Sequence, residues 1–270
     1  MELNQSYDAL VAQGLGVVAI SYDTVEILQK FSERKGQFRF TALADPESKI
    51  IESFGIRNPN TKPGTLQHGM AFPGTYIVNK DNIVQQKFFD KSYRQRLTAK
   101  NVLLKVFGAG EGGQRTEAEV KPQFNLTAYP SQDAIAPGQR IVLMAEIDLL
   151  DKVHLYAPGS SYRAIDLKIE NHSALMAGEL NLPESENIFL EVIDETVPVY
   201  FGKVRISREV TVSPNYKGSR INIGATLEYQ TCDDELCYLP DKLPLNFEIS
   251  LSKYDRQRAP EGVKHTGGFR

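Results

Sequence analysis

The segment ATLEYQTCDDELCYLPDKLPLNFEISL (225–251) holds both cysteines of the chain, Cys232 and Cys237, between two stretches typical of β-strands. If the intervening DDEL (233–236) is a four-residue hairpin loop, the two cysteines face each other across the ladder. Directly opposed residues then have Cα atoms about 4.5 Å apart, inside the range of about 4.4–6.8 Å for a disulfide. The spacing therefore permits a disulfide with little backbone movement.

Such a bridge would have little value as a staple. It closes a ring of six residues, for which chain entropy gives about 2 kcal/mol. A hairpin already ordered by its ladder gains less than this, and a structural disulfide stabilises more when it joins distant segments. The spacing alone leaves two interpretations open, a pair that opens and closes in redox exchange and a fixed clip.

Three acidic residues lie between the cysteines, namely Asp233, Asp234 and Glu235. Like charges beside a sulfur disfavour the thiolate and should raise the pKa of both thiols. A pair whose reduced form gains no thiolate stabilisation favours its disulfide, and it therefore acts as a reductant. The alternative is that these acids form only a solvated turn.

The second half of the chain has the pattern of a β-sandwich. Eight short segments that are β-branched or alternating lie between Pro, Gly and Asn residues, which predicts an antiparallel β-sandwich over 120–252. These segments are FNLTAYPS, RIVLMAEIDLL, VHLYAPG, AIDLKIE, NIFLEVID, VRISREVTVS, RINIGATLEYQT and LPLNFEISL. The Gly-rich GAGEGGQRTEAE (108–119) predicts a flexible linker before it, and the polar residues 253–270 predict a disordered tail.

The first half instead alternates strand and helix patterns. The expected strands are 16–21, 40–45, 75–79 and 83–89, and the expected helices are 25–36, 46–55 and 92–107. Asp23 and Thr24 offer an N-cap to the helix that starts at Val25. Strands interleaved with helices predict an α/β domain over 1–107.

Length and charge agree with two globular domains. At 270 residues the chain exceeds a typical single domain, and its net charge of −3 offers no field for nucleic acid. No apolar run approaches the roughly 20 residues that span a membrane. The first residues, MELNQSYDAL, lack the basic start and apolar run of a secretory signal.

The segment FPGTYIVNKDN (72–82) and the order of elements around it resemble the second half of a thioredoxin-like redoxin of the AhpC/TSA (peroxiredoxin) family. The resemblance covers about residues 1–105. In that superfamily the proline before the strand is cis and faces the redox cysteine, which makes Pro73 the candidate here. The alternative is an ordinary trans proline that begins a strand.

This first domain departs from the family in one decisive respect. No cysteine occurs in residues 1–231, so the domain lacks a peroxidatic thiol, and a peroxidase is excluded. The family's cysteine-bearing strand, which would lie between the strands at 16–21 and 75–79, is also missing. We therefore expect an incomplete redoxin fold without enzymatic activity, from a fragment or a gene start placed too late, whose parent carries the strand, the cysteine and an export signal.

The second domain resembles the N-terminal domain of the thiol:disulfide interchange protein DsbD family. YQTCDDELCYLP (229–240) is similar to its active-site hairpin, VHLYAPG (153–159) to an early strand and turn, and VPVYFGKVRISREVTV (197–212) to the segment with its cap loop. The resemblance implies an immunoglobulin-like sandwich in which Cys237 makes the mixed disulfide and Cys232 resolves it. It also implies an aromatic cap over the cysteines, with Tyr200 the best candidate and Phe201 beside it.

The resemblance implies a reducing relay. The Cys232–Cys237 dithiol would pass electrons to oxidised thioredoxin-like partners, with a membrane-bound donor among the candidate sources, in the periplasm or another extracytoplasmic compartment. No cofactor is expected. Tyr238, beside Cys237, could belong to a docking surface, although packing is the simpler interpretation. The alternative function is a non-catalytic binding protein whose hairpin disulfide is a fixed clip.

No metal site is expected from the four histidines. His68, His154, His172 and His265 are scattered, and none lies at ligand spacing from another or from the cysteines. His154, in the strand-like VHLYAP, is interpreted as a packed or edge histidine.

Overall fold

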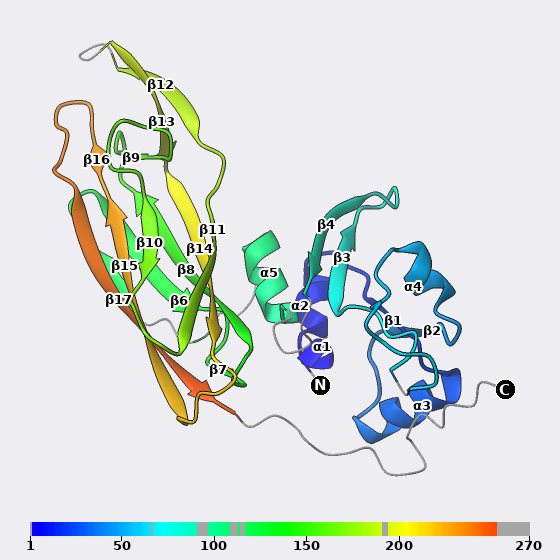
Figure 1. The fold of residues 1–270 in the computed structure, drawn as a ribbon. Helices are drawn as coiled ribbons and strands as arrows, with labels where there is room; N and C mark the ends of the chain where they lie inside the picture. Colours follow the sequence, from blue (N-terminus) through cyan, green and yellow to red (C-terminus); the bar gives the residue numbers. More distant parts are fainter. Residues whose placement is uncertain are drawn as a thin grey trace. The chain divides into compact units, whose positions relative to one another are not determined.

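The computed structural model describes residues 2–65, 67–90, 97–108, 113, 117–190 and 194–252. Within these residues the chain divides into two compact units, one within 2–99 and the other within 100–252. Each unit is described by itself (Figure 1). The predicted disordered tail, 253–270, lies outside the described residues, as do 91–96 of the predicted helix and most of the predicted linker.

The first unit alternates helices and strands as the sequence predicts. Its elements are α1 (Glu2–Gln5), α2 (Tyr7–Ala12), β1 (Val18–Ser21), α3 (Val25–Arg34), β2 (Thr41–Ala44), α4 (Lys49–Ser53), β3 (Gly74–Val78) and β4 (Val84–Phe89). The N-cap of α3 is Thr24, whose hydroxyl accepts a hydrogen bond from the Ile27 amide at 3.4 Å. This contact satisfies one of the amides that a helix start leaves unpaired.

The strands of the first unit form two separate pairs. β1 runs parallel to β2, and β3 runs antiparallel to β4, with no strand among the described residues joining the pairs. Apolar residues of the first pair remain exposed, with Val18 at 59%, Ile20 at 43% and Leu43 at 42% of their full accessible surface. This is the incomplete thioredoxin-like piece that the sequence predicts.

The prediction of a cis Pro73 differs from the structure. The described residues contain no cis peptide bond, so the bond before Pro73 is trans. The trans isomer is the favoured one, by about 0.5–1 kcal/mol for a bond preceding proline. Pro73 instead precedes β3, and its carbonyl accepts a hydrogen bond from the Asp90 amide at 3.1 Å, which extends the β3–β4 pairing.

Helix α5 (Ala99–Phe107) ends the segment that the sequence assigns to the first domain, but from Lys100 onward it belongs to the second unit. The buried Asn101 side chain donates to the Arg140 carbonyl at 3.0 Å. Lys105 pairs with Glu209 at 2.8 Å, and Arg140 pairs with the other carboxylate oxygen of Glu209 at 3.0 Å. A buried carboxylate with two cations therefore fixes α5 to the strands behind it.

Two large sheets form the sandwich of the second unit (Figure 1). One sheet has the order β10 (Asp166–Ile169), β15 (Arg220–Tyr229), β17 (Asp241–Leu251) and β7 (Ala134–Ile135). The other has the order β11 (Leu175–Asn181), β14 (Lys203–Val212), β8 (Arg140–Leu149), β6 (Phe124–Pro130) and β5 (Glu117–Val120).

The core of the sandwich follows from alternation along the strands. In β17 every second residue from Leu243 to Ile249 is buried and the residues between are exposed. In β15 the residues from Ile221 to Leu227 alternate in the same way, with the residues between them half-buried or exposed. The inward side chains of both sheets form one cluster that includes Phe124, Ile147 and Phe247. The period of two thus places one face of each sheet in the core.

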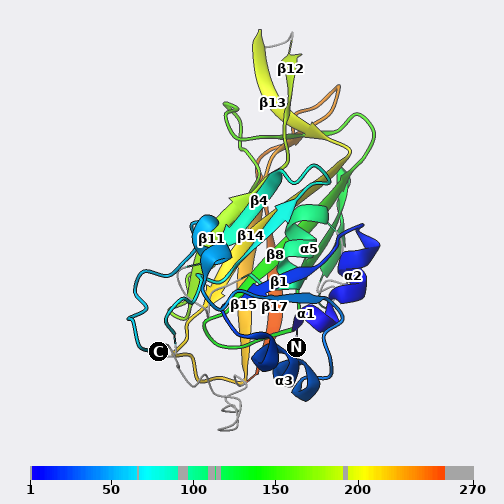
Figure 2. The same cartoon turned by 90° about the vertical axis from the view of Figure 1, so that its right-hand side faces the viewer.

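A third, smaller sheet continues the sandwich at one end. Its order is β12 (Glu186–Leu190), β13 (Glu195–Phe201), β9 (His154–Tyr156) and β16 (Thr231–Cys232). Figures 1 and 2 show the β12–β13 ribbon projecting beyond the two large sheets. The chain crosses from β13 into β14 at Gly202, whose φ of 60° is readily adopted by glycine.

Several strands of the sandwich escaped the sequence analysis. Residues 117–120 of the predicted linker form β5, which pairs with β6. The short β7, the largely exposed β11 and the strand β13 were not among the eight expected segments. β13 was interpreted as part of a cap loop, but the run VPVYFGKVRISREVTV is two strands bent at Gly202. Strand pairing outweighs local composition at these positions.

We expect Glu209→Gln to lower the free energy of unfolding by about 2 kcal/mol, because it removes the buried carboxylate that Lys105 and Arg140 share and leaves Lys105 paired with the exposed Glu179. The matched control is Glu248→Gln, which removes the exposed Arg220–Glu248 pair and should cost less than about 1 kcal/mol. Urea unfolding followed by far-ultraviolet circular dichroism measures both. Equal losses in the two variants would contradict the role of Glu209.

Candidate thiol–disulfide site

The two cysteines are bonded to each other in the structure. Cys232 and Cys237 lie directly opposite in an isolated antiparallel bridge, with their Cα atoms 4.1 Å apart. They do not extend the β15–β17 ladder, however, which ends at the pair Tyr229 and Asp241. The intervening residues leave that sheet, and Thr231 and Cys232 pair with β9 instead. The segment expected to be the tip of the β15–β17 hairpin therefore leaves that sheet and pairs with β9 of the third sheet.

The acidic loop between the cysteines, 233–236, is a turn ordered by hydrogen bonds. The Asp233 carboxylate accepts hydrogen bonds from the amides of Glu235 at 2.9 Å and Leu236 at 2.7 Å, and from the Tyr238 hydroxyl at 2.8 Å. These donors, the Glu235 amide first, lower the pKa of Asp233, because they favour its charged form. Asp234 pairs with Lys152 at 3.2 Å. Two of the three acids are therefore partnered.

The two sulfur-bearing residues differ sharply in exposure. Cys232 is 1% exposed and belongs to a small apolar cluster with Tyr156, Val197 and Val199. Cys237, five residues further along the chain, is exposed. A thiol–disulfide exchange requires access to the sulfur that is attacked. Of the two bonded residues, Cys237 is consequently the one that lies at the surface.

Tyr156 contacts both sulfurs from beneath. Its hydroxyl lies 3.0 Å from the Cys232 sulfur and 3.7 Å from the Cys237 sulfur. Because a disulfide sulfur carries no proton, the hydroxyl is the donor in both contacts. The ring is fully buried and stacks on Tyr162 at 4.3 Å between centroids. Burial, with smaller contributions from Tyr162 and Glu195, raises the pKa of Tyr156 to about 12. It therefore stays a proton donor at neutral pH.

His154 lies beside the disulfide, which the sequence did not indicate. It pairs with Cys232 across β9 and β16 and is only 6% exposed. Its ring packs edge-on against Tyr156 at 5.3 Å and near Phe201 at 5.8 Å between centroids. Burial lowers the pKa of His154, against the opposing effect of Asp234 and Asp233. The expectation of a packed histidine agrees with this burial.

The three candidate cap and docking residues, Tyr200, Phe201 and Tyr238, do not all lie on the same side of the sheet. Tyr200 pairs with Leu155, one residue away from the His154–Cys232 pair, so alternation turns it to the opposite face. There it is buried in the main core, and its hydroxyl donates to the Pro183 carbonyl. Tyr200 therefore does not cover the cysteines, contrary to the prediction.

Phe201 and Tyr238 do lie on the cysteine side. Phe201 is 42% exposed beside His154, and Tyr238 is half-buried with its hydroxyl on Asp233. The aromatic residue whose hydroxyl contacts both sulfurs is Tyr156. Tyr156 belongs to the motif VHLYAPG, which carried part of the resemblance. The motif does not show that Tyr156 contacts the sulfurs, because this contact depends on which strands pair.

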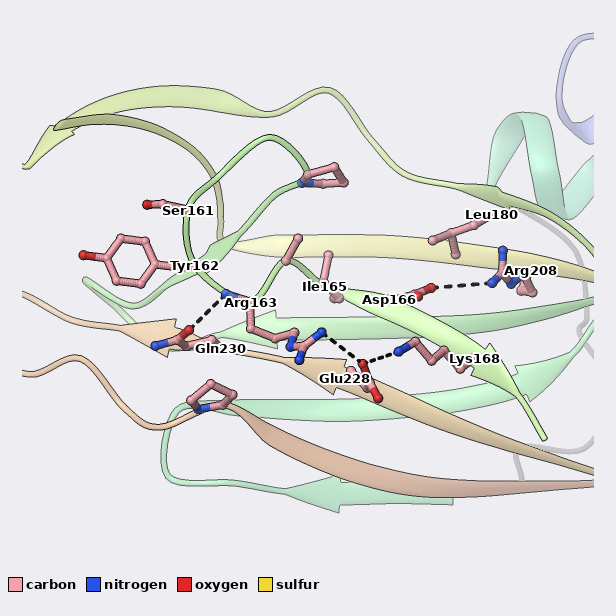
Figure 3. Close-up of a pocket in the computed structure, with 13 residues that line it drawn as sticks. Ser161, Tyr162, Arg163, Ile165, Asp166, Lys168, Leu180, Arg208, Glu228 and Gln230 are labelled. Carbon is pink, nitrogen blue, oxygen red and sulfur yellow. Dashed lines mark hydrogen bonds and ion pairs between the residues drawn. The ribbon is translucent and has the colours of Figure 1, made fainter. Parts of the chain in front are cut away.

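An open groove of about 740 Å³ borders the site through Tyr162 and Gln230 (Figure 3). The Gln230 side chain accepts a hydrogen bond from the Arg163 amide at 3.1 Å. The basic groups that line the groove are paired. Lys168 lies 2.6 Å from Glu228, and Arg208 lies 3.6 Å from Asp166. These ion pairs stabilise the outer face of the sheet.

No metal or membrane feature accompanies the site in the described residues. Among them, no group of three or more His, Cys, Asp and Glu side chains is arranged to hold a metal ion. No helix in the described ranges is long and apolar enough to cross a membrane.

Two segments of the chain match known families. Residues 1–87 match the AhpC/TSA family, and residues 126–247 match the N-terminal domain of thiol:disulfide interchange protein DsbD. The fold and these matches define a thioredoxin-like redoxin piece followed by a sandwich of the DsbD N-terminal type. Both resemblances expected from the sequence are thereby confirmed, and the disulfide lies in the second of them.

The particular relatives are distant. The peroxiredoxin-like protein bcp of Haemophilus influenzae is 30% identical over 86 residues, which are 32% of this chain and 54% of that protein. The chain thus spans about half the length of this curated relative. The N-terminal periplasmic domain of ScsB from Proteus mirabilis aligns over 52% of each chain with 13% identity and a TM-score of 0.37. The N-terminal domain of DsbD from Neisseria meningitidis, in the reduced form, aligns over 40% of this chain and 75% of that chain, with 19% identity and a TM-score of 0.29.

We expect Glu228→Gln to reduce stability in a pH-dependent way. Hydrogen bonds from Lys168, then Lys242, lower the pKa of Glu228 to about 2, below its unfolded value of about 4.3. A depressed folded pKa contributes stability above the unfolded pKa, and this contribution is lost as the pH falls toward 2. Because both lysines are at least half exposed, the loss at pH 7 should be about 1 kcal/mol. Urea titrations at pH 7 and pH 2 should show the variant and the parent converging; a constant difference would contradict this.

Proposed function

We propose that the sandwich is a thiol–disulfide exchange module that passes reducing equivalents through Cys232 and Cys237 to oxidised partner proteins. The observation that carries this proposal is the asymmetry of the bridge, in which an exposed Cys237 is bonded to a buried Cys232. The match of residues 126–247 to the DsbD N-terminal domain supports it.

The asymmetry supports a different role for each sulfur. When the module is reduced, a donor thiolate attacks the Cys237 sulfur, the bond between the two cysteines breaks, and Cys232 leaves as a thiolate. A second donor thiol then displaces Cys237, so the donor becomes oxidised and the module holds two thiols. When the module donates, the Cys237 thiolate attacks a partner disulfide, and Cys232 then displaces the reduced partner and restores the bridge.

Tyr156 supports the breaking of the bridge. Its hydroxyl already points at the Cys232 sulfur at 3.0 Å. When that sulfur becomes a buried thiolate, the same hydrogen bond becomes charge-assisted and stronger. The exposed Phe201 and the half-buried Tyr238 lie on the cysteine side, and we propose them as contacts for the partner.

The remaining parts of the proposal concern the whole chain. We propose that the redoxin piece, within 1–99, is inactive as a thiol enzyme because it has no cysteine, and that the sandwich unit, within 100–252, includes α5 and β5. The partners are proposed to be thioredoxin-like proteins, a membrane-bound electron donor among them. The proposed compartment is the periplasm or another extracytoplasmic space, where protein disulfides persist.

A fixed clip is the competing function. The burial of Cys232 and the built turn around Asp233 favour it, because both would hold the bridge in a single state. The two functions differ in whether the folded protein exchanges the bridge with an external thiol.

Cys232→Ala should convert the module into a trap for partner proteins. Its exposed Cys237 should form a stable mixed disulfide with a single-cysteine thioredoxin activated as its thionitrobenzoate disulfide. The release of thionitrobenzoate and the mass of the adduct measure the reaction. In the matched Cys237→Ala variant the remaining thiol is buried, and we expect reaction at least tenfold slower. Equal rates, or a parent bridge that survives strong dithiothreitol in the folded state, would favour the clip.

Tyr156→Phe should slow reduction of the bridge by dithiothreitol about tenfold. The removed hydroxyl donates to the departing Cys232 sulfur, and one such hydrogen bond contributes about 1–1.5 kcal/mol. Tyr162→Phe is the control, since it keeps the ring stack. Stopped-flow measurement of the reduction rate, with circular dichroism to verify the fold, compares them. The assignment fails if both variants react like the parent.

A further inference from the structure

We propose that His154 is the proton acceptor for the Cys232 thiol when that residue resolves the mixed disulfide. This inference rests on the proposed exchange function and names a residue that neither the cysteine motif nor the matched segments single out. Three independent features of the described residues carry it, namely position, an unsatisfied nitrogen and the absence of water.

The first feature is position. His154 and Cys232 are direct partners in the β9–β16 pairing, so their side chains lie on the same face. Directly opposed Cβ atoms in an antiparallel pair are about 4.5–5.5 Å apart. An imidazole and a thiol at that spacing are within reach of a hydrogen bond through ordinary rotamers. Tyr156, two residues along β9 on the same face, contacts the same sulfur through its hydroxyl.

The second feature is a ring nitrogen that is not satisfied in the disulfide state. His154 Nε2 is buried and has no hydrogen-bond partner among the residues that the structure describes. Unpaired buried polar groups are rare in folded proteins, because they have lost water without a replacement. A disulfide sulfur has no proton to offer this nitrogen, whereas a reduced Cys232 carries an S–H donor. Reduction therefore supplies the missing partner.

The third feature is the exclusion of water from Cys232. At 1% exposure its thiol has little access to solvent bases, so its proton must pass to a protein group before the sulfur can attack. The Tyr156 hydroxyl is already protonated and cannot accept the proton at neutral pH. Asp233 and Asp234 are held by the turn amides and by Lys152. His154 remains as the base beside the sulfur.

The charged surroundings of His154 suit a transient imidazolium. The acids of the turn, Asp233 and Asp234, favour its charged form, and Lys152 is paired with Asp234. The two rings packed on it, Tyr156 and Phe201, are uncharged. Burial lowers the pKa of His154 below its ordinary value, so the resting ring is a neutral acceptor at pH 7.

The resolving step then balances as follows. The Cys232 thiol gives its proton to His154, and the resulting thiolate attacks the Cys237 sulfur of the mixed disulfide. The partner leaves as a thiolate with the electron pair of the broken bond, and the bridge forms again. The imidazolium releases its proton to the partner thiolate or to solvent, and His154 returns to the neutral state.

The test uses the reduced full chain and an aromatic disulfide, dithiobis-nitrobenzoate, as the probe. Cys237 releases one thionitrobenzoate in a first, concentration-dependent phase, and Cys232 releases the second in an intramolecular phase. We expect His154→Phe to leave the first phase unchanged and to slow the second at least tenfold at pH 7. Between about pH 6.5 and 8.5 the parent's second phase should be nearly flat. That of the variant should rise about tenfold per pH unit, with the thiolate fraction.

Equilibrium with glutathione provides a second readout. His154→Phe removes an acceptor that only the reduced state satisfies, so the ratio of dithiol to disulfide should fall about tenfold, which is about 30 mV for this two-electron couple. His154→Gln, which keeps an acceptor, should recover part of the second-phase rate. His172→Phe is the matched control, since His172 contacts Ala174 and Tyr216 away from the site.

The outcomes separate the two proposals. If the parent bridge neither reduces nor reacts in two phases, the exchange function itself fails. If the parent shows both phases and His154→Phe matches it in second-phase rate, pH profile and glutathione equilibrium, only the role of His154 is overturned. The first phase, measured in the same sample, verifies that a variant has kept its folded and reactive site.

Discussion

The site depends on one pairing, that of the two-residue strand β16 with β9. The β15–β17 ladder closes at Tyr229 and Asp241, whose side chains also hydrogen-bond at 2.9 Å. Beyond that pair the chain leaves the β15–β17 ladder. The Gln230 side chain stabilises this segment by donating a hydrogen bond to the Tyr238 carbonyl at 3.0 Å. Pairing with β9 then brings Cys232 over Tyr156 and beside His154. Without it, both sulfurs would lie in a solvated loop and would be chemically alike.

Much of this fold follows from short-range pattern. The alternation in 220–229 and 243–251, the cap at Thr24 and the change of composition after residue 107 are local signals, and the structure contains the elements that they predict. The opposed cysteines were also foreseeable, because a spacing of five residues restricts the possible turns. What local pattern cannot give is which strand lies next to which. β9 is only three residues long, and its neighbours β13 and β16 come from segments that are distant in the sequence.

The prediction that Tyr200 caps the cysteines illustrates this limit, because it is wrong by one residue. Tyr200 and Phe201 are adjacent in an apolar run, and either could face the cysteines when only the sequence is considered. Pairing with Leu155 sends Tyr200 into the core, while pairing with His154 leaves Phe201 on the cysteine side. A shift of one residue would exchange the two faces. The same alternation selects His154 and Tyr156 as the neighbours of the disulfide and directs Leu155 into the core.

The balance of forces at the two sulfurs also differs from what the acidic loop alone suggests. Three carboxylates near two thiols predict a raised thiol pKa and a reducing pair, but Asp233 is held by turn amides and Asp234 by Lys152, which reduces the negative field at the bridge. Cys232 is affected mainly by burial, which disfavours its thiolate, and by the Tyr156 hydroxyl, which favours it. Cys237 remains exposed to solvent, so burial disfavours neither its thiol nor its thiolate. Ionising the buried sulfur requires more free energy than ionising the exposed one. The exposed thiolate therefore forms first, and the two sulfurs react in a fixed order. In the proposed exchange the exposed cysteine therefore meets the partner, and the buried cysteine acts only once that partner is bound.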